Sequence, residues 1–299
     1  MANLRDIRNR ITSVNNTEQI TRAMKMVAAA RLRKAQSRIV SARPYAAKMR
    51  EVVGRLVSAE TIEIDLLRQP ESCERVLFLV IGSDRGLCGG FNTNLFKVVE
   101  SNLKREWAGH LERDAVDMIC VGRKAEAYFS KRGYRIDKSY PGFFDRLDFT
   151  EAVEVMEYCT ERFLSGEVDR VELCFNEFKS VITQNRVVEK LLPVDPSELL
   201  GVDSGKDEAS TEIDYIFEPD KASILKRLLP RYLNIGLWRA LLESNASEQG
   251  ARMAAMDNAT ENAKELKREL RLQYNRARQS AITTEISEIV SGAQALGSD

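Results

Sequence analysis

The sequence from Leu237 to Gly292 reads LWRALLESNASEQGARMAAMDNATENAKELKRELRLQYNRARQSAITTEISEIVSG. This stretch contains no proline, and Gly250 is its one interior glycine. A continuous helix of this length would measure roughly 80 Å, at a rise of about 1.5 Å per residue. Apolar and small residues recur at steps of three and four, which favours a coiled-coil seam over one broad apolar face. The predicted seam residues are Leu237, Leu241, Ala251, Ala255, Ala259, Leu266, Leu270, Ala277, Ala281, Ile286 and Ile289.

The N-terminal stretch, from Asn3 to about Val57, has the same spacing and predicts a second long helix. Pro44 is its only proline and is expected to bend or loosen the helix, because proline lacks an amide hydrogen. Two such helices at opposite ends of a chain fold most economically against each other, as an antiparallel coiled coil. The predicted seam residues are Leu4, Ile7, Ile11, Val14, Ile20, Met24, Val27, Leu32, Ala35, Ile39, Ala42, Met49, Val52 and Leu56.

The middle of the chain alternates apolar strand-like runs with helical segments, which is typical of an α/β domain with a largely parallel sheet. The predicted fold is therefore a coiled coil of the terminal helices with an inserted Rossmann-like α/β domain. The expected ranges are 1–57 and 221–295 for the two helices, 74–194 for the α/β domain and 195–220 for an acidic loop and linker. Pro230 could mark a kink or the true start of the last helix. The expected strands are Val76–Ile81, Val116–Val121, Tyr134–Asp137, Arg170–Phe178 and Ser180–Leu192, and the expected helices are Asn92–Trp107, with Asn92 as a possible cap, Lys124–Lys131 and Glu151–Phe163.

Charge is strongly segregated along a chain whose total net charge is zero. Residues 1–57 carry 13 Lys and Arg against 3 Asp and Glu, a net charge of +10. Residues 58–220 carry 20 against 33, a net charge of −13, and residues 221–299 carry 12 against 9, a net charge of +3. The basic N-terminal helix could be a solvated face, or it could meet an acidic protein surface or a nucleic acid.

Cysteine usage and hydropathy indicate the kind of compartment in which the chain works. The five cysteines are odd in number and lack paired spacing, so we expect thiols in a reducing compartment and neither a disulfide framework nor a zinc site. No apolar run has the length of a membrane span, and the N-terminus lacks the apolar core of a signal peptide.

The stretch Ser83–Asn92 lies between a predicted buried strand and a predicted helix, where phosphate-binding loops occur. It contains neither G-x-G-x-x-G nor a Walker motif. Its glycines therefore favour a tight turn or a close approach by another backbone segment over a nucleotide site. His110 is the only histidine and has no nucleophile motif beside it, so the residue chemistry indicates no active site, no cofactor and no metal.

Several stretches resemble the γ subunits of F-type ATP synthases. The resemblance rests on the segments Ile7–Ile11, Asn16–Thr17, Gln19–Ala29, Asp84–Gly90, Glu218–Asp220, Ala246–Gln249, Ala251–Met253, Tyr274–Thr283 and Glu288–Gly292. It implies a rotor in which the paired helices turn inside a ring of three α and three β subunits, while the α/β domain lies beside subunit ε and on the membrane-embedded c-ring. A γ subunit couples ion-driven rotation to ATP synthesis at the β subunits and performs no bond chemistry itself. The start at Met1 without a leader and the lack of a chloroplast insert favour the cytoplasmic face of a bacterial inner membrane.

The resemblance also implies particular contact residues. Arg278, Gln279 and Thr283 match positions that hydrogen-bond to a β-subunit loop, and Arg85 and Cys88 lie in a loop that approaches the acidic lever of β. The segment that meets the c-ring is matched by Tyr215, Phe217 and Glu218, with Phe217 in a position that is often tyrosine.

The sequence differs from the γ-subunit pattern at two places, and it leaves two alternative functions open. The loop after Asp195 lacks the cysteine pair of the chloroplast form, so no thiol switch is expected, and Pro230 predicts a bend in the last helix. The first alternative function is a coiled-coil nucleic-acid binder with a basic arm, which would bind RNA in a salt-sensitive way. The second is a phosphate-binding α/β enzyme that uses Gly86–Gly90.

Overall fold

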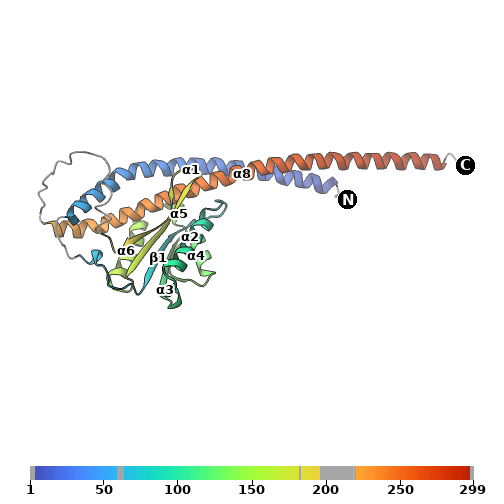
Figure 1. Cartoon of the computed structure of the whole chain (residues 1–299). Helices are drawn as coiled ribbons and strands as arrows, with labels where there is room; N and C mark the ends of the chain where they lie inside the picture. Colours follow the sequence, from blue (N-terminus) through green and yellow to red (C-terminus); the bar gives the residue numbers. More distant parts are fainter. Residues whose placement is uncertain (1–3, 59–63, 182, 196–217, 219, 297–299) are drawn as a thin grey trace. The chain divides into compact units, whose positions relative to one another are not determined.

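The computed structural model describes residues 4–58, 64–181, 183–195, 218 and 220–296. By their internal contacts these residues form two units, one drawn from Met1–Ala28 and Arg252–Asp299 and the other from Ala29–Ala251. Two long helices, α1 (Leu4–Ser58) and α8 (Lys221–Leu296), contribute to both units (Figure 1). Both long helices predicted from the sequence are present. The four expected domain ranges stay a prediction.

The second unit contains a five-stranded sheet with the strand order β3-β2-β1-β4-β5. Neighbouring strands from β3 to β4 are parallel, and only β4 and β5 pair antiparallel. The prediction of a largely parallel sheet is therefore confirmed. The strands are β1 (Val76–Ile81), β2 (Val116–Val121), β3 (Arg135–Tyr140), β4 (Arg170–Phe178) and β5 (Gln184–Leu192).

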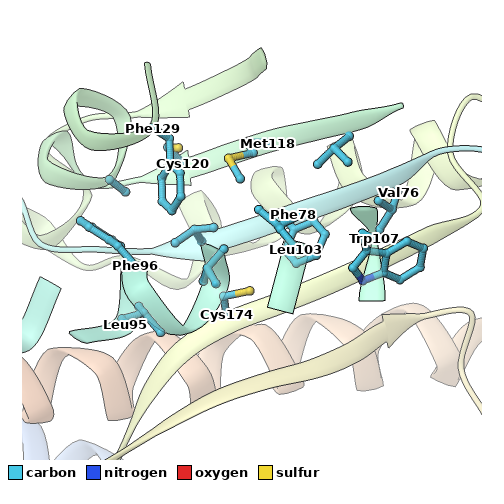
Figure 2. Packing of buried hydrophobic residues seen from close by; sticks show 14 residues of the cluster. Val76, Phe78, Leu95, Phe96, Leu103, Trp107, Met118, Cys120, Phe129 and Cys174 are labelled. Carbon is cyan, nitrogen blue, oxygen red and sulfur yellow. The ribbon is translucent and has the colours of Figure 1, made fainter. Parts of the chain in front are cut away.

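Helices cover both faces of this sheet, as the buried central strands β1, β2 and β4 require. α2 and α4 pack on the face of Phe78 and Met118, in the core cluster of Figure 2. α6 packs on the other face, where its Arg162 contacts Asp117 of β2. The helices are α2 (Phe91–Glu106), α3 (Ala108–Glu112), α4 (Arg123–Ser130), α5 (Phe143–Arg146) and α6 (Phe149–Leu164), with a short 3₁₀ turn at Asp65–Leu67.

Some boundaries differ from the prediction for identifiable reasons. β5 begins at Gln184 instead of Ser180, because the amide of Ser180 donates to the carbonyl of Thr183 and closes a turn. α8 begins at Lys221, where Asp220 accepts hydrogen bonds from the amide and the hydroxyl of Ser223 as an N-cap. Pro230 is therefore not the start of the helix. Neither Pro230 nor Pro44 interrupts its helix, and a bend at either proline stays a prediction.

Within the second unit, α8 is buried on nearly all sides from Leu241 to Gly250. The hydroxyl of Ser247 donates to the backbone carbonyl of Asn176 in β4, at 3.0 Å. A Cβ atom at Gly250 would lie 3.5 Å from both Phe178 and Val181. This stretch of α8 thus packs against the inserted domain, and its small residues allow the close approach.

In the first unit, α1 and α8 run antiparallel. Lys25 forms an ion pair with Asp257 at 2.5 Å, and Glu18 pairs with Lys267 further along α8. Between these pairs the hydroxyl of Thr260 donates to that of Thr21 at 2.8 Å, in a buried position. The antiparallel pairing predicted from the sequence is confirmed here.

Several predicted seam positions are wrong. Ile20, Val27 and Val52 are exposed, and their neighbours Thr21, Ala28 and Val53 are buried instead. On α8, Leu266 is also exposed, whereas Met256, Thr260, Ala263 and Leu270 are buried. Ile286 and Ile289 are exposed because they lie beyond the part of α8 that α1 covers.

Candidate subunit-contact surfaces

The first candidate surface is the end of α8. Arg278, Gln279 and Thr283 are all exposed there, as expected of residues that contact another chain. The hydroxyl of Thr283 donates to the carbonyl of Gln279 at 2.9 Å, which fixes its side chain against the helix and leaves the oxygen lone pairs outward. Among the described residues, the side chains of Arg278 and Gln279 have no hydrogen-bonding partner. Every described side chain from Ile282 to Ala293 is exposed as well.

The second candidate surface is the loop that follows β1. Its Asp84 is almost fully buried, and its carboxylate accepts three backbone hydrogen bonds. Oδ1 accepts from the amides of Arg123 at 3.1 Å and Gly142 at 2.6 Å, and Oδ2 accepts from the amide of Phe144 at 3.0 Å. One carboxylate thus joins the segments that follow β1, β2 and β3.

A second set of hydrogen bonds fixes the base of the same loop. The side-chain oxygen of Asn92 accepts from the amide of Ser83 at 2.9 Å, and its nitrogen donates to the Ser83 hydroxyl at 2.7 Å and to Cys88 Sγ at 3.4 Å. The prediction of Asn92 as a helix cap is wrong, because Gly90 holds that position and Asn92 turns back to the loop. Cys88 is only 2% exposed, so the structure does not bring its thiol to the surface with Arg85.

The exposed part of the loop is made by Arg85 and Leu87. Arg85 Nη2 lies 2.9 Å from Asp145 Oδ1 in α5, with both side chains about half exposed. Leu87 is 66% exposed and adopts a left-handed backbone conformation, with φ of 62°. The sequence-based assignment missed Leu87, Asp84 and Asp145. An apolar residue in a Gly-rich polar loop was the available signal for Leu87.

The loop does not favour phosphate binding. Gly89 supplies a turn with φ of 57°, and Gly122 brings two backbone segments together, since a Cβ on Gly122 would lie 2.6 Å from the carbonyl oxygen of Gly82. The buried Asp84 carboxylate also occupies the carboxyl edge of the strands, and its charge would repel a phosphate. The glycines therefore serve close backbone packing, in agreement with the preferred interpretation of the sequence.

The third candidate surface is only partly described. Tyr215 and Phe217 lie outside the described residues, and Glu218 is exposed. Its role at a c-ring stays a prediction.

The cysteines and the single histidine have structural positions. All five cysteines are free thiols, as predicted. Burial raises the pKa of Cys73 to about 11 and those of Cys120 and Cys159 to about 12, so these thiols stay protonated at neutral pH. His110 lies 2.8 Å from the carbonyl of Cys73 and packs edge-on against Trp107.

Among the described residues, no group of three or more His, Cys, Asp or Glu side chains could hold a metal ion. In the same part of the chain, no helix combines the length and the apolar character needed to cross a membrane.

The fold defines a class of proteins in which two paired terminal helices accompany an inserted, mostly parallel α/β domain. The family described as ATP synthase matches residues 3–296. The chain is 51% identical to the ATP synthase gamma chain of Chlorobium phaeobacteroides (strain BS1), over 99% of each sequence. It is 52% identical to that of Prosthecochloris aestuarii (strain DSM 271 / SK 413), again over 99% of each. The chain therefore belongs to the family of ATP synthase gamma chains.

A solved structure shows the same fold at lower identity. The matching chain comes from the mitochondrial ATP synthase of Euglena gracilis, solved as OSCP, F1 and c-ring in rotational state 3. It superposes with a TM-score of 0.72 at 22% identity, covering 98% of this chain and 94% of the other.

Proposed function

We propose that this chain is the central rotor of an F-type ATP synthase. The paired helices turn inside a ring of three α and three β subunits, and the rotation couples ion flux across the membrane to ATP synthesis. Hydrolysis of ATP drives the rotation in reverse. The chain itself catalyses no covalent reaction, since the nucleotides bind to the ring.

The observation that carries this proposal is the exposed end of α8 in a gamma-chain sequence. α8 continues beyond the part that pairs with α1, and its last buried apolar residue among those described is Leu270. Beyond Ala281 the helix presents an apolar set to solvent: Ile282, Ile286, Ile289 and Val290. Contiguous apolar exposure of this kind marks an interaction site, and the inner wall of the ring is a partner that would cover it.

Other partners follow from the same proposal. Subunit ε would lie beside the α/β domain, and the c-ring would contact Tyr215, Phe217 and Glu218. The chain would then be peripheral to a bacterial inner membrane, on its cytoplasmic face, with attachment through the c-ring.

The contacts at the end of α8 have a defined chemistry. Gln279 and Thr283 are four residues apart and lie on one face of the helix. Arg278 adds a charge on the neighbouring face. Together they could hydrogen-bond to a loop of one β subunit in one rotor position and release it in the next. This contact, which we call the catch, would then depend on the rotation angle.

The test is reconstitution with α and β subunits, followed by ATPase measurement. Thr283→Ala and Gln279→Ala should each lower turnover by roughly 2- to 10-fold, the value of one hydrogen bond expressed as a rate. Thr284→Ala is the matched control, because Thr284 is exposed, makes the same bond to its own helix at 3.0 Å, and faces another direction. Equal turnover in the Thr283, Gln279 and Thr284 variants would remove the catch assignment.

A further inference from the structure

Two segments at the carboxyl edge of the parallel strands are joined by one side chain. Asp84 follows β1, and the amides of Gly142 and Phe144 follow β3. Its two carboxylate oxygens accept from these amides at 2.6 and 3.0 Å, and Oδ1 also accepts from Arg123 after β2. Hydrogen bonds to a charged acceptor are stronger than those between neutral groups. The loop after β1 and the turn at α5 are therefore held as one body.

The four-residue helix α5 depends on such an anchor. It is too short to be stable alone, and left-handed residues flank it on both sides, Gly142 with φ of 82° and Leu147 with φ of 48°. Asp84 binds the amide of the N-cap residue of α5, Gly142, and the amide of the second residue of this helix, Phe144. A second tie lies further out, where Arg85 pairs with Asp145. The buried carboxylate sets the position of α5, and the exposed ion pair adds to it.

The two joined segments present one basic surface with an apolar residue in the loop. Arg85, Leu87 and Arg146 are exposed on it. Lys124, at the start of α4, is also exposed and lies beside Gly86, whose Cβ position would be 3.7 Å from Lys124 Cε. Arg123, whose Nη2 lies 3.5 Å from the Cβ position of Gly142, adds a fourth exposed cation, and the exposed carboxylates described on these segments are those of Asp145 and Asp148. A surface of this charge suits an acidic partner with an apolar side chain.

We infer that Asp84 is a positioning residue which makes α5 part of the β-subunit contact, so that Arg146 acts beside Arg85. The inference rests on the proposed function and on the contact between the Arg85 loop and a β subunit that the resemblance to γ subunits implies. It predicts that an exposed arginine about sixty residues away from the loop in sequence takes part in the same contact as Arg85.

The first measurement is amide hydrogen exchange on the full chain. Asp84→Asn keeps the shape of the side chain but loses its charge, and it points an NH₂ group at amide donors. The amides of Gly142 and Phe144 should exchange at least about tenfold faster than in the unmodified chain. Unchanged exchange at both amides would overturn the positioning role.

The second measurement uses the complex with α and β subunits. Arg85→Ala and Arg146→Ala should each lower ATPase turnover by about twofold to fivefold at low salt, with the difference shrinking as salt is added. Lys104→Ala is the control, since Lys104 is an exposed cation on α2, away from this surface. Arg146 is exposed, so its variant should fold even if Asp84→Asn does not.

The outcomes separate the inference from the proposed function. If the complex is active and Arg146→Ala behaves like Lys104→Ala, α5 is not part of the contact and the inference is wrong. If turnover of the ring does not depend on this chain at all, the proposed function fails and the inference falls with it. A salt-dependent loss in Arg146→Ala, with faster exchange in Asp84→Asn, supports the inference.

Discussion

At the scale of single residues, Asp117 shows how a buried charge is held. It is fully buried in β2 and lies within 3.3 Å of guanidinium nitrogens from three arginines. Arg135 is the residue of β3 that pairs with Asp117, and Arg75 immediately precedes β1. Arg162 reaches Asp117 from α6 while also pairing with Asp137. Removing one member of such a network leaves the others desolvated and uncompensated.

Asp117→Asn should therefore lower the free energy of unfolding by about 3 to 5 kcal/mol, measured by urea denaturation. Glu112→Gln, an exposed carboxylate on α3, serves as the control and should change stability by less than about 0.5 kcal/mol. If Asp117→Asn lowers the free energy of unfolding no more than the control does, the ion-pair network does not stabilise the fold.

Glu243 gives a prediction about pH. It is buried on α8, and burial raises the pKa of its carboxyl above the ordinary value, with Arg239 and Arg43 opposing the shift. At a pH between the pKa of the unfolded state and that of the folded state, the Glu243 carboxyl keeps its proton in the folded state and has released it in the unfolded state. The stability from this group is complete below the unfolded pKa, about 4.3, and is lost as the pH rises through the folded pKa.

Glu243→Gln should remove this part of the pH dependence. The variant should gain stability relative to the unmodified chain as the pH rises above about 4.3, and the two should converge at lower pH. Denaturation midpoints over a pH series measure the difference. Glu157→Gln, at an exposed position on α6, is the control. Parallel curves for the unmodified chain and Glu243→Gln would contradict the assignment.

At the scale of elements, the pairing of α1 and α8 can be tested with two leucines. Leu270 is 3% exposed and Leu272 is 53% exposed on the same helix. Leu270→Ala should cost about 2 to 5 kcal/mol, while Leu272→Ala should cost little beyond a small change in helix propensity.

Hydrogen exchange of the α1 amides before Ala28 gives a local measure of that cost. Faster exchange in Leu270→Ala, and not in Leu272→Ala, is the expected result. Equal exchange in the two variants would mean that α1 does not depend on this side of α8.

The helices and strands also show which features of the fold a sequence pattern is enough to predict. β1, β2 and β4 begin and end where the apolar runs predict, because strands buried on both faces are mainly apolar, with Asp117, Glu172 and Asn176 as buried polar exceptions. The seam was predicted less well. Ile20 and Val27 fit the spacing, yet the helices approach each other at Thr21 and Ala28, where smaller side chains allow contact. A spacing of three and four residues does not separate two adjacent faces when both carry apolar residues.

The sequence also predicted some of the candidate contact residues correctly and not others. Exposure of Arg85, Arg278, Gln279 and Thr283 agrees with the roles implied by the resemblance, whereas Cys88 is turned inward by its bonds to Ser83 and Asn92. The partners of Asp84 lie about forty and sixty residues away in sequence, so no local pattern could have revealed them.

At the scale of the whole molecule, the sequence joins a basic N-terminal helix, an acidic middle and a long proline-poor last helix. Family membership and the exposed apolar end of α8 together support a rotor that is completed by other chains. We propose that this chain turns within a ring of α and β subunits and controls the nucleotide sites of that ring.

The most direct test is to assemble the chain with α and β subunits, fix the ring to a surface and attach a visible probe to the α/β domain. We predict that ATP drives rotation of the probe in one direction, in steps that follow ATP turnover. A ring that hydrolyses ATP at its full rate while the probe on the assembled chain stays still would contradict the account.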